Sequence, residues 1–342
     1  MSGTDILKMK LKRTLYLGYY LKELDWNKFS NFLEYTLRVS EKSKVAILTD
    51  IVKSVFTYNI SLLEYFQFRF YELDEEERQQ WAGTGYMYEF QQRMNPTDAR
   101  SILENKPEFM EEYEEFIRHD FATIDELRKS DKKARKLLKV QSGKLVLKRS
   151  DGGSGKGIQV IETEGLTKEI LLEKLEASGN DMVEEYVVQH EQLMRLSPSG
   201  LNTVRIITQV TENNEAVVID SRLRITVNSH VDNMAAGNIA AAVDSDTGVV
   251  ISDAVYSDMT KDPAENHPAT GVTIEGFQIP YWDETIQMVM QAALKNVSNR
   301  SIGWDVAITN HGPELIEGNH DWCKLLWQLP EGRGLKHKLE RF

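Results

Sequence analysis

Cysteine is almost absent from this sequence. Among its 342 residues there is one, Cys323, so the chain has no intrachain disulfide and no cysteine-rich zinc site. We expect Cys323 to be a small buried residue, because nothing beside it suggests a reactive thiolate. Lack of disulfides is typical of a reducing cytosol, and we therefore expect a cytoplasmic location.

Long hydrophobic runs are also missing. A helix that crosses a membrane needs about 20 apolar residues, and no stretch of this sequence approaches that length. The run at residues 15–21 is seven residues long, contains three tyrosines and a glycine, and lacks a small-residue cleavage site. It indicates the start of a helix rather than a signal peptide, so we expect no membrane insertion.

An excess of positive charge is missing as well. The chain has 41 Lys and Arg residues against 53 Asp and Glu residues, a formal net charge of −12. Such an acidic chain is a poor general binder of phosphate backbones, so we expect no nucleic-acid partner. Any anionic ligand needs a local cluster of Lys and Arg. The hydrophobic fraction of 41% is close to that of globular proteins, and the length predicts about two domains.

Glycine is scarce in the first hundred residues, and we expect residues 1–100 to be a mostly helical region whose aromatic side chains pack as core. From about residue 140 the pattern is that of strands, expected at 144–148, 158–161, 181–188, 204–210, 216–227, 239–243, 302–309 and 314–317. Helices are expected at 167–177, after an N-cap at Thr167, and at 282–297. Short polar turns between strands predict an α+β body with a largely antiparallel sheet.

A glycine-rich loop at residues 151–157 is the first sign of chemistry. Glycines let backbone N–H groups approach an anion closely. Lys148 ends the preceding strand and Lys156 lies in the loop, so both can point at one phosphate. The spacing is that of neither a P-loop nor the dinucleotide-binding fingerprint. Taken alone, the loop is equally well explained as a tight hairpin without a ligand.

Two carboxylates and an amide near the other end are the second sign. Asp305 and Glu317 lie on consecutive strands joined by a turn, so their side chains can face each other. Asn319 follows Glu317 by two residues and therefore points to the same face of its strand. Such oxygen ligands suit Mg²⁺, which also bridges substrate phosphates. The alternative is a solvated hairpin with ordinary surface acids.

Taken together, the two sets resemble the nucleotide and metal sites of the ATP-grasp superfamily, in the same order from Lys106 to Asn319. The resemblance implies an α+β fold in which two subdomains grip ATP. The lysine and flap subdomain corresponds to residues 101–188 and the metal-binding subdomain to 189–330. The helical region at 1–100 precedes this domain, where ATP-grasp ligases usually have a small parallel α/β unit. A basic tail at 331–342 follows it, either a solvated helix end or a clamp for an anionic substrate.

The resemblance also implies site residues and ligands. Lysines and a closing flap would hold the phosphates of ATP, the backbone at Glu184 and Val187 would bind adenine, and Glu185 or His190 would reach the ribose. The nucleotide-binding residues would be Lys106, Lys148, Gly153, Ser154, Gly155, Lys156, Gly157, Glu184, Glu185, Val187 and His190. Asp305, Glu317 and Asn319 match the family's metal ligands. Two Mg²⁺ ions are expected, for which Mn²⁺ can substitute.

Several phrases resemble more narrowly the sugar-transfer associated ATP-grasp proteins, which are linked to surface-polysaccharide synthesis. They are Gln189-His190, residues 201–208, residues 231–233, His267-Pro268, residues 302–305 and residues 315–319. The order of Arg205, Arg224 and residues 230–233 is similar to tubulin tyrosine ligase, and the D-alanine–D-alanine ligases are more distantly similar. The resemblance implies catalytic roles for Arg205, Arg224 and Lys148, and substrate contacts from Asn202, Asn233 and His267. Strand alternation puts Arg222 on the same face as Arg224, so Arg222 remains an alternative.

The activity that follows is an ATP-dependent carboxylate–amine ligase acting through an acyl phosphate. Its expected substrates are a small carboxylate, such as a uronic acid or sugar-linked acid of capsule or other surface polysaccharide synthesis, and a small amine. One alternative is an ATP-grasp kinase that phosphorylates a hydroxyl. Another is a nucleotide-sensing protein without enzymatic activity, which would have no need of the complete metal set.

Overall fold

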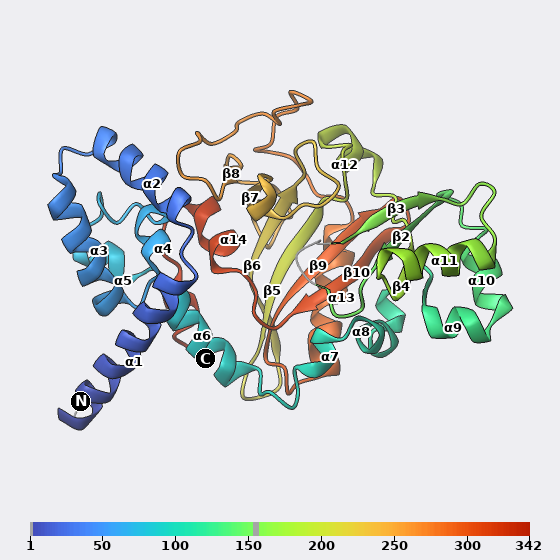
Figure 1. The fold of residues 1–342 in the computed structure, drawn as a ribbon, viewed down its shortest axis with the longest axis horizontal. Coiled ribbons are helices and arrows are strands. Elements are labelled where there is room, and N and C mark those ends of the chain that lie inside the picture. Colours follow the sequence, from blue (N-terminus) through green and yellow to red (C-terminus); the bar gives the residue numbers. More distant parts are fainter. Residues whose placement is uncertain (1–2, 153–156) are drawn as a thin grey trace.

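The computed structural model describes residues 3–152 and 157–342, with side chains from residue 12 onward. A helical N-terminal region lies beside a larger body that contains two β-sheets (Figure 1). Four residues of the expected flap, Gly153, Ser154, Gly155 and Lys156, fall outside the described residues. The prediction of antiparallel sheets preceded by a helical region is confirmed.

Six α-helices build the described part of the N-terminal region, and polar side chains cap several of them. They are α1 (Gly3–Lys22), α2 (Trp26–Val39), α3 (Lys44–Tyr58), α4 (Leu62–Gln67), α5 (Glu75–Gln79) and α6 (Thr84–Met94). Asp25, Ser43 and Ser61 accept hydrogen bonds from the first turns of α2, α3 and α4, which satisfies backbone groups that helix starts leave unpaired. The expected aromatic core is present, since Phe32, Tyr65, Phe66, Phe68, Phe70 and Trp81 are buried together.

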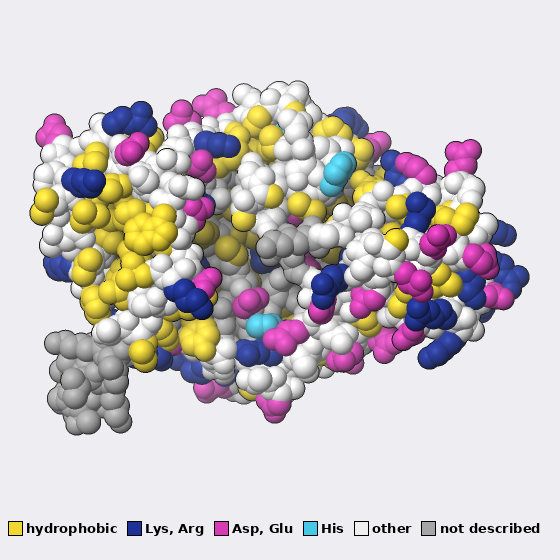
Figure 2. Space-filling model, in the orientation of Figure 1, with side chains coloured by type: hydrophobic (Ala, Val, Ile, Leu, Met, Phe, Trp, Pro, Cys, Tyr) yellow, Lys and Arg dark blue, Asp and Glu magenta, His cyan; other side chains and the backbone are white. Residues whose placement is uncertain are grey.

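Figure 2 contrasts the surfaces at the two ends of the molecule. Hydrophobic side chains gather over the helical region, whereas charged side chains of both signs cover the far end. Among the described helices, none is both long and apolar enough to cross a membrane.

A small sheet forms the end opposite the helical region. Its strands are β1 (Phe121–Thr123), β2 (Lys144–Lys148), β3 (Gln159–Glu162) and β4 (Met182–Glu185), in the order β1-β4-β2-β3. The helices α9 (Ile124–Lys129), α10 (Asp131–Leu137) and α11 (Lys168–Ser178) contribute to its core, where Leu145 and Leu147 of β2 meet Leu171 and Leu175 of α11. Alternation along β2 buries these leucines and leaves the lysines at its two ends half-buried.

The large sheet forms the centre of the body. It contains β5 (Thr203–Val210), β6 (Ala216–Ile225), β7 (Ile239–Val243), β8 (Val255–Tyr256), β9 (Ser301–Thr309) and β10 (Gly312–Asn319), in the order β10-β9-β5-β6-β7-β8. Helix α13 (Trp282–Lys295) packs against one face (Figure 1). Every residue of β5 and β9 is buried, so both faces of these central strands are covered. The other α-helices of the described residues are α7 (Ser101–Glu104), α8 (Lys106–Glu112), α12 (Glu191–Leu196) and α14 (Lys324–Gln328).

Two expectations about the C-terminal part are corrected. The tail at 331–342 was expected to be a solvated helix end or a clamp for an anionic substrate, but Leu335 and Leu339 are fully buried in one cluster with Phe90 of α6 and Trp327 of α14. The apolar residues between its charged ones are what hold it there. Cys323, expected to be buried, is exposed at the N-cap of α14.

Candidate active site

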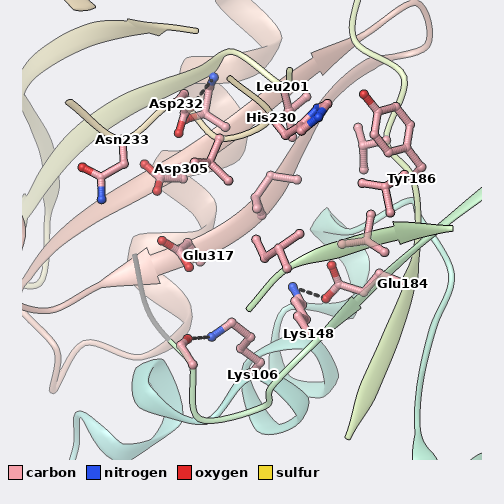
Figure 3. A pocket seen from close by; sticks show the side chains of 18 of the residues that line it. Lys106, Lys148, Glu184, Tyr186, Leu201, His230, Asp232, Asn233, Asp305 and Glu317 are labelled. Carbon is pink, nitrogen blue, oxygen red and sulfur yellow. Dashed lines mark hydrogen bonds and ion pairs between the residues drawn. The ribbon is translucent and has the colours of Figure 1, made fainter. Parts of the chain in front are cut away.

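A cavity lies between the small sheet and the large sheet (Figure 3). Its walls come from β2 and β3, from the segment after β4, from β6 and the segment that follows it, and from β9 and β10. Many predicted site residues line it together: Lys106, Lys148, Glu184, Glu185, Val187, Arg224, Asn233, Asp305 and Glu317. Residues separated by two hundred positions in the sequence are thus brought to one cavity.

Two lysines stand on the small-sheet side of the cavity. Lys148 ends β2 and forms an ion pair with Glu184 of β4. Lys106 begins α8, whose N-cap is Asn105, and its amine donates to the carbonyl of Gly152. Burial and the positive charge of Lys148 lower the pKa of Lys106. A polyphosphate between them would offset this repulsion.

Two carboxylates stand on the large-sheet side. Glu317 of β10 is paired with Asp305 of β9, and a bulge between Leu315 and Glu317 shifts the register there. In a regular hairpin Ile316 would take the place opposite Asp305; the bulge puts Glu317 there instead. Both Ile316 and Glu317 line the cavity.

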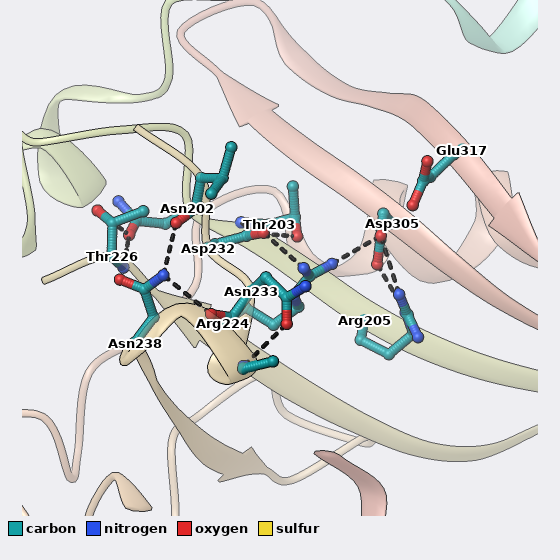
Figure 4. A network of polar contacts seen from close by, with 12 residues as sticks. Asn202, Thr203, Arg205, Arg224, Thr226, Asp232, Asn233, Asn238, Asp305 and Glu317 are labelled. Atoms are coloured by element: carbon teal, nitrogen blue, oxygen red, sulfur yellow. Dashed lines mark hydrogen bonds and ion pairs between the residues drawn. The ribbon is translucent and has the colours of Figure 1, made fainter. Parts of the chain in front are cut away.

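Arginines surround Asp305 (Figure 4). Its Oδ1 accepts from Arg205 Nε at 2.6 Å, and its Oδ2 accepts from Arg205 Nη2 at 2.9 Å and from Arg224 Nη1 at 2.7 Å. Burial would raise the pKa of Asp305, but the two guanidinium groups outweigh it and hold this pKa well below its ordinary value. Burial and the charge of Asp305 raise the pKa of Glu317.

These residues fit a divalent cation. No cluster of three or more His, Cys, Asp or Glu side chains suited to a metal occurs within the described residues, but Mg²⁺ typically takes one or two carboxylates and completes its shell with water and phosphate oxygens. Asn319 is not among the cavity-lining residues; it donates from Nδ2 to the Gly303 carbonyl at 3.1 Å, and its Oδ1 is the atom that could bind a cation. The pKa of Glu317 is raised by burial and by the negative charge of Asp305. A cation bound between the two acids would relieve their repulsion.

The structure separates Arg222 from Arg224. Arg222 is fully buried and donates from Nε to the Trp327 carbonyl at 2.8 Å, away from the cavity. Arg224 lines the cavity, and its Nη2 lies 2.6 Å from Asp232. Arg205 is not among the cavity-lining residues; it is buried beside Asp305 and holds that carboxylate.

Three expected contact residues lie elsewhere. Asn202 is fully buried and its Oδ1 accepts from Thr226 N at 2.8 Å. His267 is also buried, with Nε2 at 2.8 Å from the Thr226 carbonyl. His190 accepts at Nδ1 from Gln192 N at 3.2 Å and so caps α12. These polar groups satisfy buried or helix-end backbone atoms, and none of the three lines the cavity.

Asn233 and the segment after β4 do line the cavity. Asn233 accepts from Ala235 N at 2.9 Å and caps the short helix η2 (Met234–Ala236). At the end of β4, the N–H groups of Glu185 and of the following Tyr186 donate to the carbonyls of Asp120 and Lys144, respectively. The Val187 N–H has no hydrogen-bond partner in the part of the chain that the structure describes.

Sequence reasoning missed other cavity residues. Asp232 and His230 line the cavity beside Asn233; the segment 230–233 was noted in the sequence, but only Asn233 in it was predicted to be a site residue. Tyr186 and Leu201 also line it (Figure 3). His119 lies behind the cavity, bonded to Glu314, and no motif in the sequence marked it.

The sequence matches the profile of the family described as sugar-transfer associated ATP-grasp over residues 86–342. No curated protein sequence matches the chain. Among solved structures, the ATP-grasp ligase PsnB with its minimal precursor is 14% identical with a TM-score of 0.41, and the match covers 72% of this chain and 63% of that chain. Biotin carboxylase from Campylobacter jejuni is 12% identical with a TM-score of 0.44, covering 71% and 46%.

A third solved structure, D-alanyl-alanine synthetase A from Vibrio cholerae, is 13% identical with a TM-score of 0.40, and the match covers 70% of this chain and 62% of that chain. The chain therefore spans about half to two thirds of the length of these three structures. The family profile covers most of the chain, from α6 to the last residue, and includes every predicted site residue. This chain belongs to the sugar-transfer associated ATP-grasp family.

Proposed function

We propose that this chain is an ATP- and Mg²⁺-dependent carboxylate–amine ligase. The observation that carries the proposal is one cavity in which two lysines face a buried pair of carboxylates across the gap between two sheets. Cations on one side and metal-binding acids on the other are the groups that position a nucleoside triphosphate for phosphoryl transfer. Membership of the ATP-grasp family supports the same assignment.

The cavity suggests how ATP is oriented. Apolar side chains line it beside the segment after β4: Val146, Ile158, Val160 and Ile316. Such side chains suit the faces of a purine, and the Val187 N–H, which has no partner among the described residues, can donate to one of its ring nitrogens. Glu185 is the carboxylate proposed for the ribose. The phosphates then lie between the two lysines and opposite Asp305 and Glu317, and the resemblance implies that a flap corresponding to residues 152–157 covers them.

The metal residues are proposed to be Asp305, Glu317 and Asn319, with two Mg²⁺ ions, or Mn²⁺ in their place. A bound divalent cation supplies neutralisation of the charge on the transferring phosphoryl group. Arg205 keeps Asp305 ionised and fixed, since it donates two hydrogen bonds to that carboxylate. Lys106 and Lys148 offset the negative charge of the phosphates that leave with ADP.

The proposed reaction has two steps. A substrate carboxylate oxygen attacks the γ-phosphorus, the bond to the β-phosphate oxygen breaks, and ADP and an acyl phosphate result. An amine nitrogen then attacks the acyl carbon, loses a proton and displaces inorganic phosphate, which leaves an amide. Arg224 lines the cavity next to Asn233, and these two residues are proposed to hold the acyl phosphate and the acceptor. Closure of the flap would keep water from the acyl phosphate.

The substrate class is proposed from the family description, which associates these proteins with sugar transfer. A uronic acid or sugar-linked acid of surface polysaccharide synthesis and a small amine would be the partners, in the cytoplasm and without nucleic acid. A second candidate is a kinase that phosphorylates a sugar hydroxyl. It is favoured by the pairing of Arg224 with both Asp232 and Asp305, because an arginine that is already neutralised attracts a substrate carboxylate less strongly.

A stoichiometry experiment tests the proposal. The protein is incubated with ATP, Mg²⁺, a pool of uronic acids and nucleotide-linked uronic acids, and a pool of amino acids and amino alcohols. Equal amounts of ADP and inorganic phosphate with a new condensed mass would establish a ligase. ADP without phosphate, and a mass gain of one phosphoryl group, would establish the kinase. Formation of AMP would contradict the acyl-phosphate mechanism.

The variant Glu317→Gln is the matched control for this experiment. It should abolish turnover while leaving much of the nucleotide binding, because the lysines and the apolar walls remain. Unchanged product formation in Glu317→Gln would contradict the assignment of the metal residues.

A further inference from the structure

A buried histidine connects the two sheets behind the cavity. His119 lies just before β1 and is 7% exposed. Its Nδ1 is 2.7 Å from Glu314 Oε2 on β10, in the large sheet. Its Nε2 is 3.9 Å from Glu184 Oε2 on β4, in the small sheet. The backbone N–H groups of Arg118 and His119 also donate to Glu314, at 3.0 and 3.1 Å, which fixes that carboxylate.

The chain of charges continues to the cavity. The other carboxylate oxygen of Glu184 pairs with Lys148, so Lys148, Glu184, His119 and Glu314 form one buried row of four groups. With an imidazolium at His119 the row contains two cations and two anions. With a neutral imidazole it has one uncompensated negative charge, which is costly in a buried place.

Two groups compete for the positive charge of Lys148: the carboxylate of Glu184 and the phosphates of the proposed nucleotide. Lys148 is the partner of Glu184 in the structure, and the proposed function requires it to turn toward the phosphates of ATP. If Lys148 leaves Glu184 while His119 is neutral, a buried carboxylate is left without a cation. If His119 is protonated, Glu184 keeps a cation and Lys148 can turn away at lower cost.

We propose that His119 is a positioning residue. As an imidazolium, it replaces Lys148 as the cationic partner of Glu184, and Lys148 is then free to bind the phosphates of the nucleotide. The proposal rests on the nucleotide-binding role given to Lys148 above. His119 itself does not line the nucleotide cavity, so it acts through Glu184.

The groups that face His119 set the direction of its titration. They are Glu314 from β10, Glu184 from β4 and Lys148 from β2. The charged neighbours of His119 in its own segment have other partners: Arg118 donates to the His311 carbonyl, and Asp120 pairs with Lys136 of α10. Burial lowers the pKa of His119, but the two glutamates outweigh both burial and Lys148, and the pKa lies above its ordinary value. The imidazolium therefore persists to higher pH than that of an ordinary imidazole, and it is lost as the pH rises through this raised pKa.

Nucleotide affinity across pH tests this role. The Kd of a fluorescent ATP analogue with Mg²⁺ is measured from pH 6 to pH 9.5 for the wild type, His119→Gln and Glu314→Gln. At low pH, His119→Gln should bind about tenfold more weakly than the wild type, as expected for one lost charge-assisted contact. This ratio should fall toward one as the pH rises, because the wild type then loses its imidazolium too. Because the two Kd values are compared at the same pH, the effect of the nucleotide's own protonation on affinity cancels in the ratio.

Glu314→Gln separates positioning from a structural role. It leaves Lys148 and Glu184 in place but removes one of the carboxylates that raise the pKa of His119, so the pH at which wild-type-like affinity is lost should move lower. His337→Gln, which changes an exposed histidine of the tail, should leave the profile unchanged.

Two results would overturn the inference in different ways. Equal pH profiles for the wild type, His119→Gln and Glu314→Gln would refute the role of His119 and leave the proposed function standing. Absence of nucleotide binding by the wild type at every pH would refute the proposed function and this inference with it.

Discussion

At Asp305, hydrogen bonds from two guanidinium groups compensate for the burial of a carboxylate. Arg205 supplies two of them and is itself buried. Replacing Arg205 by Met keeps an apolar stem but removes both bonds, and we expect a loss of about 3–5 kcal/mol in the free energy of unfolding. Urea denaturation of the metal-free protein at pH 7 measures it.

The matched control is Arg195→Met. Arg195 forms an exposed ion pair with Glu191 at 3.1 Å, with 70% of its side chain accessible, and its replacement should change the free energy by less than about 0.5 kcal/mol. Equal costs for the two variants would mean that Arg205 does not hold Asp305.

Residue type and spacing predicted a large part of the site. Lys148, Asp305 and Glu317 were chosen as charged residues at strand positions, and the structure brings all three to one cavity. Asn202 and His267 were expected from the family resemblance alone, and they are instead buried against the backbone of Thr226. A sequence shows where a polar side chain occurs, but it does not show which buried backbone group will form a hydrogen bond with it.

At the scale of elements, Glu64 joins three helices. It lies on α4, accepts from Ser61 N at 2.7 Å and from Thr84 N of α6 at 2.9 Å, and is 3.1 Å from Lys324 of α14. Burial would raise the pKa of Glu64, but Lys324 and these donors outweigh it and lower the pKa. We expect Glu64→Gln to cost about 1.5–3 kcal/mol at pH 7, the value of hydrogen bonds to a charged group.

The pH dependence has a definite sign. Because its folded-state pKa is lowered, Glu64 stabilises the protein above its ordinary pKa of about 4.3, and this contribution is lost as the pH falls through the lowered value. The difference in thermal midpoint between the wild type and Glu64→Gln should therefore shrink on acidification. The exposed Glu76→Gln should show no such trend, and a constant difference for Glu64→Gln would contradict the ionised state.

The tail provides a second test at this scale. Leu339 is fully buried against residues of α6 and α14, and Lys336 N donates to the Gln80 carbonyl at 2.8 Å. Leu339→Ala should destabilise the protein by about 2–5 kcal/mol, as for other buried leucines. Thermal or urea unfolding measures the loss, with Arg341→Ala at an exposed position as the control. A cost near zero would mean that the tail contributes nothing to the fold.

Prediction of the elements was uneven: the strand expected at 181–188 spans only Met182–Glu185. Helix α11 begins after Thr167, as its N-cap predicted, and ends one residue later than expected. Strand β2 has the expected bounds. The strands β1 and β8, of three and two residues, were missed because so few residues give no periodic pattern. The tail was expected to be solvated because most of its residues are charged or polar. The burial of Leu335 and Leu339 depends on partners in α6 and α14 that are distant in the sequence.

At the scale of the whole molecule, the nucleotide would bind residues of both sheets at once. Any ligand that binds the folded state alone raises stability, by about 2.7 kcal/mol at a concentration of 100 Kd. We expect ADP with Mg²⁺ to raise the thermal midpoint by several degrees, and ADP with EDTA to raise it less, because the acids at Asp305 and Glu317 then face the phosphates without a cation.

Thermal shift measurements with ADP, Mg²⁺ alone and EDTA resolve the two contributions. In Glu317→Gln the difference between ADP with Mg²⁺ and ADP with EDTA should be largely lost, while the shift with EDTA remains. An ADP shift that is the same with and without Mg²⁺ in the wild type would argue against a metal at this pair.

The bulge in β10 has a consequence for how this hairpin can change in evolution. Strict alternation would send consecutive residues to opposite faces, yet Ile316 and Glu317 both line the cavity. Deletion of Ile316 would still leave Glu317 opposite Asp305 and would remove an apolar wall. Insertion of one more residue there would turn Glu317 toward the core. The number of residues between the turn and Glu317 thus decides both whether the acid faces Asp305 and whether the cavity keeps the apolar wall at Ile316.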